Sequence, residues 1–447
     1  MGLRFHHFMQ GFFPHFQRGS RSVGEQAEQY IQGLIQASRK NMERMEEVVP
    51  DCDYQVLQHF LSHSQWDSRA VLDQVATQAD RHLGGSVDSC LLLDESAFAK
   101  KGDKSVGVAR QWSGRLGKVE NCQVAVFACL AQGASATLID TRLYLPREWT
   151  DDLCRCLAAG VPQHEAVFKS KAELALEMVL GARSNGVRFS WVGIDGGYGK
   201  EPAFLRRLED HGEVFVAEVH RDQQIYLENP DPCTPEKKSA RGRKPTRLEA
   251  QTASLRVDEW LKTQPAELWQ RVTVRPGTKG LLRVEALHAR VWLWDGHEAG
   301  GRHWHLVVTR ELGSPGTIKY TLSNAPAETS LKRLVQMQRQ RFWIERSFED
   351  GKSEIGMADY QVRGWLAWHH HMTLVMMAML FMLEEKLLHK ESYPLLSCSD
   401  IEILLACFLP RRDVTIEEVV RKMEARHRAR KAAIDSAYRR QKLSDPS

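Results

Sequence analysis

CLLLD (90–94) and FSWVGID (189–195) decide the fold, because each is an apolar run that ends on an aspartate. Apolar runs of this length predict buried strands. We expect Asp94 and Asp195 to lie at the carboxyl ends of their strands, the edge of an α/β sheet where ligands bind. Either aspartate alone fits a turn residue equally well, so the pair carries more weight than its members.

Strand-like and helix-like segments alternate around these two runs, which predicts an α/β sheet. Helices are expected at about 164–182 and 202–208. Between about 223 and 301 the alternation is interrupted by a polar loop and then by β-like runs, which we interpret as a β-rich insertion. The further strands are expected at CQVAVFACLA (122–131), SATLIDTRLYLP (135–146), EVFVAEV (213–219), LLRVEAL (281–287), ARVWLW (289–294), WHLVVT (304–309) and IKYTLS (318–323).

Helical periodicity predicts the remaining segments. Residues 23–84 are expected to be helical, and Gly84 and Gly85 end that pattern. A helix that begins near Ala327 is expected to carry Glu345, and an apolar helix is expected at 369–388. The predicted division is an N-terminal helical DNA-binding domain (1–85), a catalytic core (86–222), the β-rich insertion (223–302), the second part of the core (303–390) and a basic helical C-terminal region (391–447).

Composition limits the class of protein. The chain has 447 residues, 43% of them hydrophobic and 26% charged, so it can bury a core. Its net charge of +4 is too small by itself to indicate a nucleic-acid partner. Nine scattered cysteines without a C-x-x-C pair favour a reducing cytoplasm. We expect neither a secretory signal nor a membrane-spanning segment.

Several separated segments resemble the DDE transposases of bacterial insertion sequences, in the IS-seven-hundred-one branch related to the IS-four group. The resemblance covers about residues 25–390. The segments are QHFLSHSQWDSRAVLDQV (58–75), DESAFAKKGDKSVGVARQWSGRLGKVENCQVAV (94–126), GIDGGYG (193–199), WQRVTVRPGTKG (269–280), YTLSNAP (320–326) and RFWIERSFEDGKSEIGMADYQVRGW (341–365).

This resemblance implies an RNase H-like catalytic core whose catalytic and metal-binding residues are Asp94, Asp195 and Glu345. Two Mg²⁺ ions, for which Mn²⁺ can substitute, would be held by these carboxylates and would promote phosphoryl transfer. Asp94 would bridge the two ions. The implied function is cut-and-paste transposition of double-stranded DNA by a homodimer in the bacterial cytoplasm, associated with the nucleoid.

The helix around Glu345 carries further candidates. In the IS-four group the catalytic Glu follows a Tyr and an Arg and precedes a Lys, and Arg341 and Lys352 match the last two positions. Spacings of four and seven put them on one helix face with Glu345, where they could contact DNA phosphates. Gln338 replaces the expected Tyr, which leaves a hairpin intermediate open. Glu349 is the lower-ranked rival of Glu345.

Other basic and aromatic residues have a structural and a DNA-binding interpretation. The loop KKSARGRKPTR (237–247) could contact a minor groove through Arg241 and Arg243, and the GTKG turn could present Lys279 to a phosphate. The basic segment 421–442 could bind DNA or be a solvated helix. Residues 369–371 are consecutive histidines, which cannot converge on a metal from one helix. One of four tryptophans could stack on an unpaired base, although most are expected in the core: Trp269, Trp292, Trp294 and Trp304.

Two alternatives stay open. A domesticated, noncatalytic DNA-binding protein could keep the fold, although the presence of all three carboxylates argues against it. An RNase H-like nuclease or resolvase could cut DNA without strand transfer.

Overall fold

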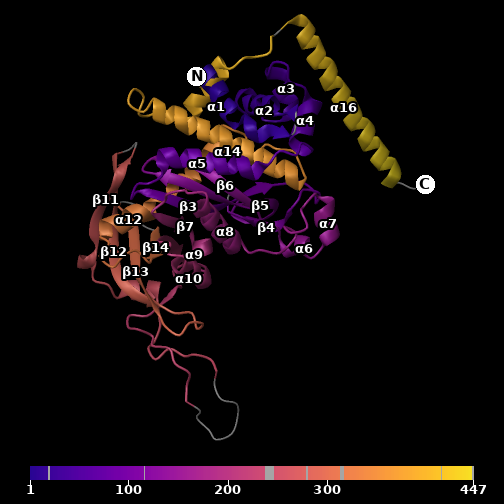
Figure 1. The fold of residues 1–447 in the computed structure, drawn as a ribbon. Coiled ribbons are helices and arrows are strands. Elements are labelled where there is room, and N and C mark those ends of the chain that lie inside the picture. The colour runs from indigo at the N-terminus through magenta and orange to yellow at the C-terminus, as the bar shows by residue number, and fades with distance from the viewer. Residues whose placement is uncertain are drawn as a thin grey trace.

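The computed structural model describes residues 1–18, 21–114, 116–236, 246–277, 280–312, 317–413 and 415–444. Figure 1 shows a large sheet and, on one side of it, a helical layer built around α14 (Trp365–Leu388). This helix contacts strand β6 of the sheet as well as the N-terminal helices, so it joins the two layers. The predicted α/β class is confirmed.

Five strands form the centre of the sheet, in the order β6-β5-β3-β7-β8. Strands β3, β7 and β8 are parallel, whereas β5 and β6 run antiparallel to their neighbours. This is the strand order of an RNase H-like core. The bounds are β3 (Ser89–Ala99), β5 (Lys118–Gln132), β6 (Ser135–Leu143), β7 (Trp191–Ile194) and β8 (Phe215–Val219), and β4 (Ala109–Ser113) pairs with the start of β5.

Helices cover this central sheet. The run from Cys122 to Ala131 of β5 is buried without interruption, because both of its faces are covered. The helices that contact β5 or β6 are α5 (Ser68–Leu83), α8 (Lys171–Ser184), α13 (Phe342–Ser353) and α14.

The strands expected in the β-rich insertion extend the same sheet beyond β8. Strand β14 (Ile318–Ser323) pairs with β8, and then follow β13 (Arg302–Glu311), β12 (Gly280–Leu293) and β11 (Gln270–Gly277). The two β-like runs at 281–287 and 289–294 are extended, as predicted. They form the single strand β12, which pairs without a break with β13 from Val284 to Leu293. The predicted domain limits stay a prediction.

The segment between β8 and β11 contains only short elements within its described part. Figure 1 shows part of it extending away from the sheet, whereas its ends pack on the protein, since Tyr226 pairs with Trp292 of β12 and Val257 is buried. The elements are β9 (Gln224–Ile225), β10 (Leu255–Arg256), α11 (Val257–Lys262) and a 3₁₀ turn, η2 (Ala266–Leu268).

The N-terminal part is helical, as predicted for residues 23–84, but it is divided into short helices. Asn41, Asp53 and Asp67 each accept backbone N–H groups at a helix start, which separates one helix from the next. One helix was not predicted: α1 (Gly2–Phe12), which buries Phe5 and Met9. The other elements are η1 (Phe13–Phe16), β1 (Gln17–Arg18), β2 (Arg21–Ser22), α2 (Gly24–Gln36), α3 (Met42–Val48) and α4 (Tyr54–Ser62).

These helices share one hydrophobic core with the sheet, since a continuous cluster of buried side chains runs from Phe5 to Leu409. The consecutive histidines of α14 lie in it. His370 stacks on Trp66 with ring centroids 3.8 Å apart, and the hydroxyl of Tyr30 lies 2.9 Å from Nδ1 of His371. His370 and His371 thus join α14 to the α4–α5 connection and to α2.

Helix α14 is, among the described residues, the one helix long and apolar enough to cross a membrane by length and composition. However, 89% of its most apolar window is buried inside the protein. Core helices pass the same test, so this helix is explained by its packing.

The predicted helix around Glu345 is two helices. α12 (Leu331–Gln340) ends just before Arg341 and α13 begins just after it. Here the N–H of Ile344 donates to the carbonyl of Arg341 (3.3 Å), three residues earlier, as in a 3₁₀ turn. The apolar spacing continues across this break, although α12 contacts β11 and β13 whereas α13 contacts β5 and β6. The remaining helices are α6 (Arg147–Thr150), α7 (Leu153–Ala158), α9 (Gly196–Gly199), α10 (Pro202–Asp210), α15 (Cys398–Phe408) and α16 (Ile416–Ser444).

Candidate active site

Asp94 and Asp195 follow a pair of residues that lie opposite each other on neighbouring parallel strands. The β3–β7 ladder ends with Leu93 opposite Ile194, and each aspartate is the next residue. The prediction that Asp94 ends its own strand is wrong, since β3 continues to Ala99 by pairing with β5. The apolar run before Asp94 therefore marks the end of the pairing with β7.

Asp195 also has a structural role. Its Oδ1 accepts hydrogen bonds from the backbone N–H groups of Gly197 (3.0 Å) and Tyr198 (3.2 Å), so it caps α9. A Cβ atom at Gly199 would lie 1.9 Å from the carbonyl oxygen of Glu218, so only glycine fits there. Helix α9 packs directly on β8 and holds Asp195 at the edge of the sheet.

Arg341 connects the carboxylates of this edge. Its Nη1 donates to Asp94 Oδ2 (3.0 Å) and its Nη2 to Glu345 Oε1 (2.5 Å). Its Nε lies 3.3 Å from Oε1 of Glu218 on β8. The junction between α12 and α13 thus places one guanidinium between residues of β3, β8 and α13.

The charges of the site act on each other. Burial raises the pKa of Asp94 to about 7, and the negative charges of Asp195 and Glu345 act in the same direction against the opposing charge of Arg341. Only 13% of the Asp94 side chain is exposed, against 51% for Glu345. Asp94 is therefore the interior member of the cluster and Glu345 the member that faces solvent.

Glu218 is a site residue that the sequence analysis missed. Its side chain pairs with Lys319 (2.8 Å) as well as with Arg341, and these two cations outweigh burial and lower its pKa. The sequence does contain a signal for Glu218: like Asp195, it stands near the carboxyl end of an apolar strand. The cluster has four carboxylates and two cations, an excess of negative charge.

Glu349 is less well placed than Glu345. It is two-thirds exposed and pairs with Arg346 (2.9 Å) on its own helix. Lys352 lies in the last turn of α13, with its Nζ 5.6 Å from the ring centroid of Phe98 on β3. Of the two glutamates, Glu345 is the one tied to Asp94 through a shared arginine.

Gln338, which stands where a Tyr was expected, lies on the buried face of α12. Its Oε1 accepts from Thr309 Oγ1 (2.9 Å), and its Nε2 donates to Thr321 Oγ1 (2.6 Å). The side chain is 2% exposed, so it attaches α12 to β13 and β14 instead of facing solvent. This residue supports the sheet below the site.

The residues of this edge fit a divalent cation in their chemistry. Mg²⁺ prefers oxygen ligands, and the cluster offers carboxylates with excess negative charge. The buried hydroxyl of Tyr198, close enough for Asp94 and Asp195 to raise its pKa in addition to burial, has no hydrogen-bond partner among the described residues. In the described residues, no three ligands are already gathered around one point, and Arg341 lies between Asp94 and Glu345.

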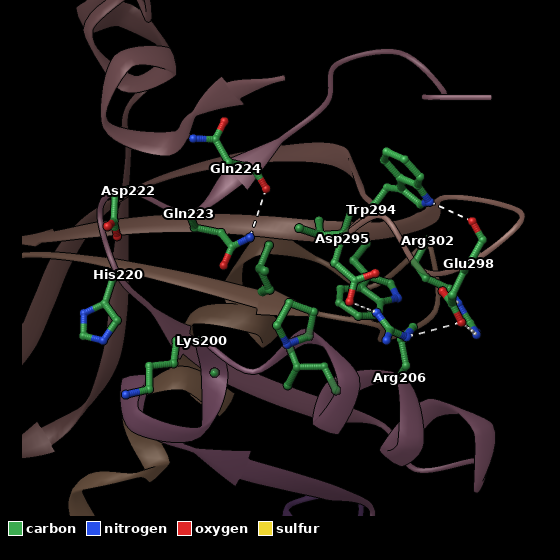
Figure 2. A pocket seen from close by; sticks show the side chains of 16 residues that line it. Lys200, Arg206, His220, Asp222, Gln223, Gln224, Trp294, Asp295, Glu298 and Arg302 are labelled. Atoms are coloured by element: carbon green, nitrogen blue, oxygen red, sulfur yellow. Dashed lines mark hydrogen bonds and ion pairs between the residues drawn. The ribbon is translucent and has the colours of Figure 1, made fainter. Parts of the chain in front are cut away.

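A pocket of about 430 Å³ lies between the end of α9, α10 and the turn after β12. Figure 2 shows Lys200 and His220 at one end and Trp294 at the other, where its Nε1 donates to the carbonyl of Glu298 (2.7 Å). Trp304 is buried, whereas Trp269, Trp292 and Trp294 are half-buried, and of these three Trp294 lines the pocket. Stacking on a base stays a prediction.

Three predicted DNA contacts, Lys279, Arg241 and Arg243, lie outside the described residues. The roles assigned to Arg341 and Lys352 stay predictions, although Arg341 has a defined place in the cluster.

Comparison with known proteins identifies the class. Residues 11–281 match the family of DDE superfamily endonucleases. The match covers more than half of the chain, so the protein belongs to this family. It includes Asp94 and Asp195 and ends before Glu345. The superfamily implies the use of a divalent metal.

The chain is also similar to a probable transposase for insertion sequence element IS701 from Microchaete diplosiphon. The two are 23% identical over 325 residues, which covers 72% of this chain and 73% of that protein. The predicted resemblance, the RNase H-like fold class and the assignment to DDE-type transposase enzymes are confirmed.

Proposed function

We propose that this protein cleaves DNA strands at the ends of an insertion sequence and joins them to target DNA. The observation that carries the proposal is the carboxylate cluster: Asp94 and Asp195 follow opposed residues of β3 and β7, and Arg341 links Asp94 to Glu345. Family membership and the similarity to a probable transposase support it.

In this proposal Asp94, Asp195 and Glu345 hold two divalent cations. Such cations, when bound, activate the attacking oxygen and stabilise the leaving oxygen of an in-line displacement. If the oxygens of Asp94 and Glu345 that now accept from Arg341 turn to the cations, the guanidinium loses these partners. It would then be available for a phosphate oxygen, which its planar fork suits. Lys352 would supply a second positive charge.

Water and a DNA 3′-hydroxyl both attack phosphorus through an oxygen atom. One site can therefore cut a strand with water and then join it to another strand through the 3′-hydroxyl. Double-stranded DNA is the proposed partner, and pairing of two ends would require a homodimer. We expect the protein in the bacterial cytoplasm, near the nucleoid.

The test uses the purified full chain, Mg²⁺ or Mn²⁺, and duplex DNA bearing the terminal repeats found beside the gene. We expect strand cleavage in the wild type and its loss in Asp94→Asn, Asp195→Asn and Glu345→Gln, with DNA binding retained. Glu349→Gln is the matched control, because it changes a glutamate one turn away that is not joined to Asp94.

Each outcome decides between the candidates. Cleavage that persists in all three variants would falsify the site assignment. End binding without cleavage by the wild type would favour a noncatalytic DNA-binding protein. Cleavage without transfer to target DNA would favour a nuclease or resolvase.

A further inference from the structure

The second half of α16 is an exposed basic helix. Figure 1 shows α16 beginning beside α3 and running outside the rest of the chain. From His427 to Gln441, which we call the distal segment, every side chain is exposed except the half-buried Ser436. The distal segment thus buries little apolar surface within the chain.

The first half of α16 is anchored by ion pairs. Arg421 pairs with Glu46 (2.9 Å) and Arg426 pairs with Glu47 (2.7 Å), both on α3. In the distal segment the cations make no ion pair with a carboxylate of the described chain; Arg439 and Arg440 contact only a backbone carbonyl and a hydroxyl of their own helix. Their charges are not needed to hold the helix.

The distal segment is strongly basic. The distal segment has five basic residues and one acidic residue, a net charge of +4. This equals the net charge of the whole chain, so the other residues balance one another. The basic residues are Arg428, Arg430, Lys431, Arg439 and Arg440.

We propose that the distal segment of α16 is a sequence-independent binding surface for the phosphate backbone of duplex DNA. At about 1.5 Å per residue it is about 21 Å long, which spans roughly six phosphates of one strand at about 3.4 Å each. The five cations lie within that length. The choice of DNA as the polyanion rests on the proposed function.

The arrangement of the cations separates DNA from other occupants. At about 100° per residue, Arg428, Arg430 and Arg440 point about 80° to 160° apart, so positive charge surrounds the helix. A helix in a groove meets phosphates on both sides, whereas a helix on a membrane needs its cations on one face. A second copy of α16 would bring a like charge and be repelled, despite the exposed Ile434 and Tyr438.

The experiment measures binding of the full chain to a labelled duplex of unrelated sequence by fluorescence anisotropy across a salt series. The test variant carries Arg→Gln at 428, 430, 439 and 440, and the matched control carries Arg→Lys at the same positions. Both replacements favour helix, but only the lysine variant keeps the charge. Circular dichroism checks that helix content is unchanged.

We expect the Gln variant to bind at least about tenfold more weakly near 100 mM salt. Its slope of log affinity against log salt should fall by about 3 to 4, at about 0.9 for each lost phosphate contact. The Lys variant should bind like the wild type. An unchanged slope in the Gln variant overturns the proposal. The proposal is also overturned if the Gln variant loses binding to anionic vesicles while its binding to DNA is intact.

The outcome is independent of cleavage. A reduced slope in a protein that never cuts DNA would refute the proposed function and leave this surface standing. Normal cleavage with an unchanged slope would do the reverse.

Discussion

Replacing Asp94 with asparagine is expected to remove a pH dependence from the folding of the metal-free protein. Burial and the charges of Asp195 and Glu345 raise the pKa of Asp94 from 3.8 to about 7. The folded protein therefore binds this proton more tightly than the unfolded chain. Between about pH 4 and pH 7 the contribution of Asp94 to stability falls as pH rises, and above pH 7 it is constant.

The size of this change in the free energy of unfolding depends on how much of the range from about pH 4 to pH 7 the experiment covers. Between pH 5 and pH 8 about two pKa units of the difference are lost, which at about 1.4 kcal/mol each is on the order of 3 kcal/mol. The asparagine variant has its own cost of about 1–3 kcal/mol, because its NH₂ must face a donor, either the N–H of Glu95 or Arg341. That cost does not depend on pH, so it cancels in the comparison.

The assay is urea denaturation followed by tryptophan fluorescence, at pH 5 and pH 8 in the presence of a chelator. Relative to the wild type, Asp94→Asn should gain roughly 2–3 kcal/mol in free energy of unfolding between the two pH values. Glu349→Gln, an exposed carboxylate, is the control and should show no comparable gain. If the difference between Asp94→Asn and wild type stays constant with pH, the reasoning about a desolvated, like-charged Asp94 is refuted.

Further predictions concern the metal and the supports of the site. Mg²⁺ at ten times its dissociation constant should stabilise the wild type by about 1.4 kcal/mol at pH 8, as measured by thermal unfolding. It should stabilise Asp94→Asn much less, and equal shifts for the two proteins would contradict a metal site at Asp94. Gln338→Leu removes both side-chain bonds to β13 and β14 and should cost about 2–4 kcal/mol in urea denaturation, and a cost below about 0.5 would show the bonds to be unimportant. Gly199→Ala forces α9 away from β8 and should lower both stability and cleavage. Gly181→Ala, in the last turn of α8 where a Cβ meets open space, should be neutral or slightly stabilising, and similar results for the two variants would refute the close packing.

Much of the fold could be predicted from local pattern. The strands around Asp94 and Asp195, the helix α8 and the buried helix α14 follow from apolar runs and helical spacing, since these patterns record which residues face a core. The division of residues 23–84 into separate helices also had a local signal in the capping residues Asn41, Asp53 and Asp67. The pattern did not reveal the break at Arg341, because helically spaced apolar residues continue across it, among them Phe342, whose side chain is exposed.

The sequence by itself determined which residues have the chemistry of the site: two aspartates after apolar runs, and a glutamate one helical turn from an arginine. The tertiary structure alone decided their neighbours. Strand register places Asp94 beside β7 and brings Glu218 into the cluster, while the α12–α13 junction places Arg341 among the carboxylates. The physical reason is that periodicity reports burial along one element, whereas strand order and register depend on contacts between residues more than a hundred positions apart.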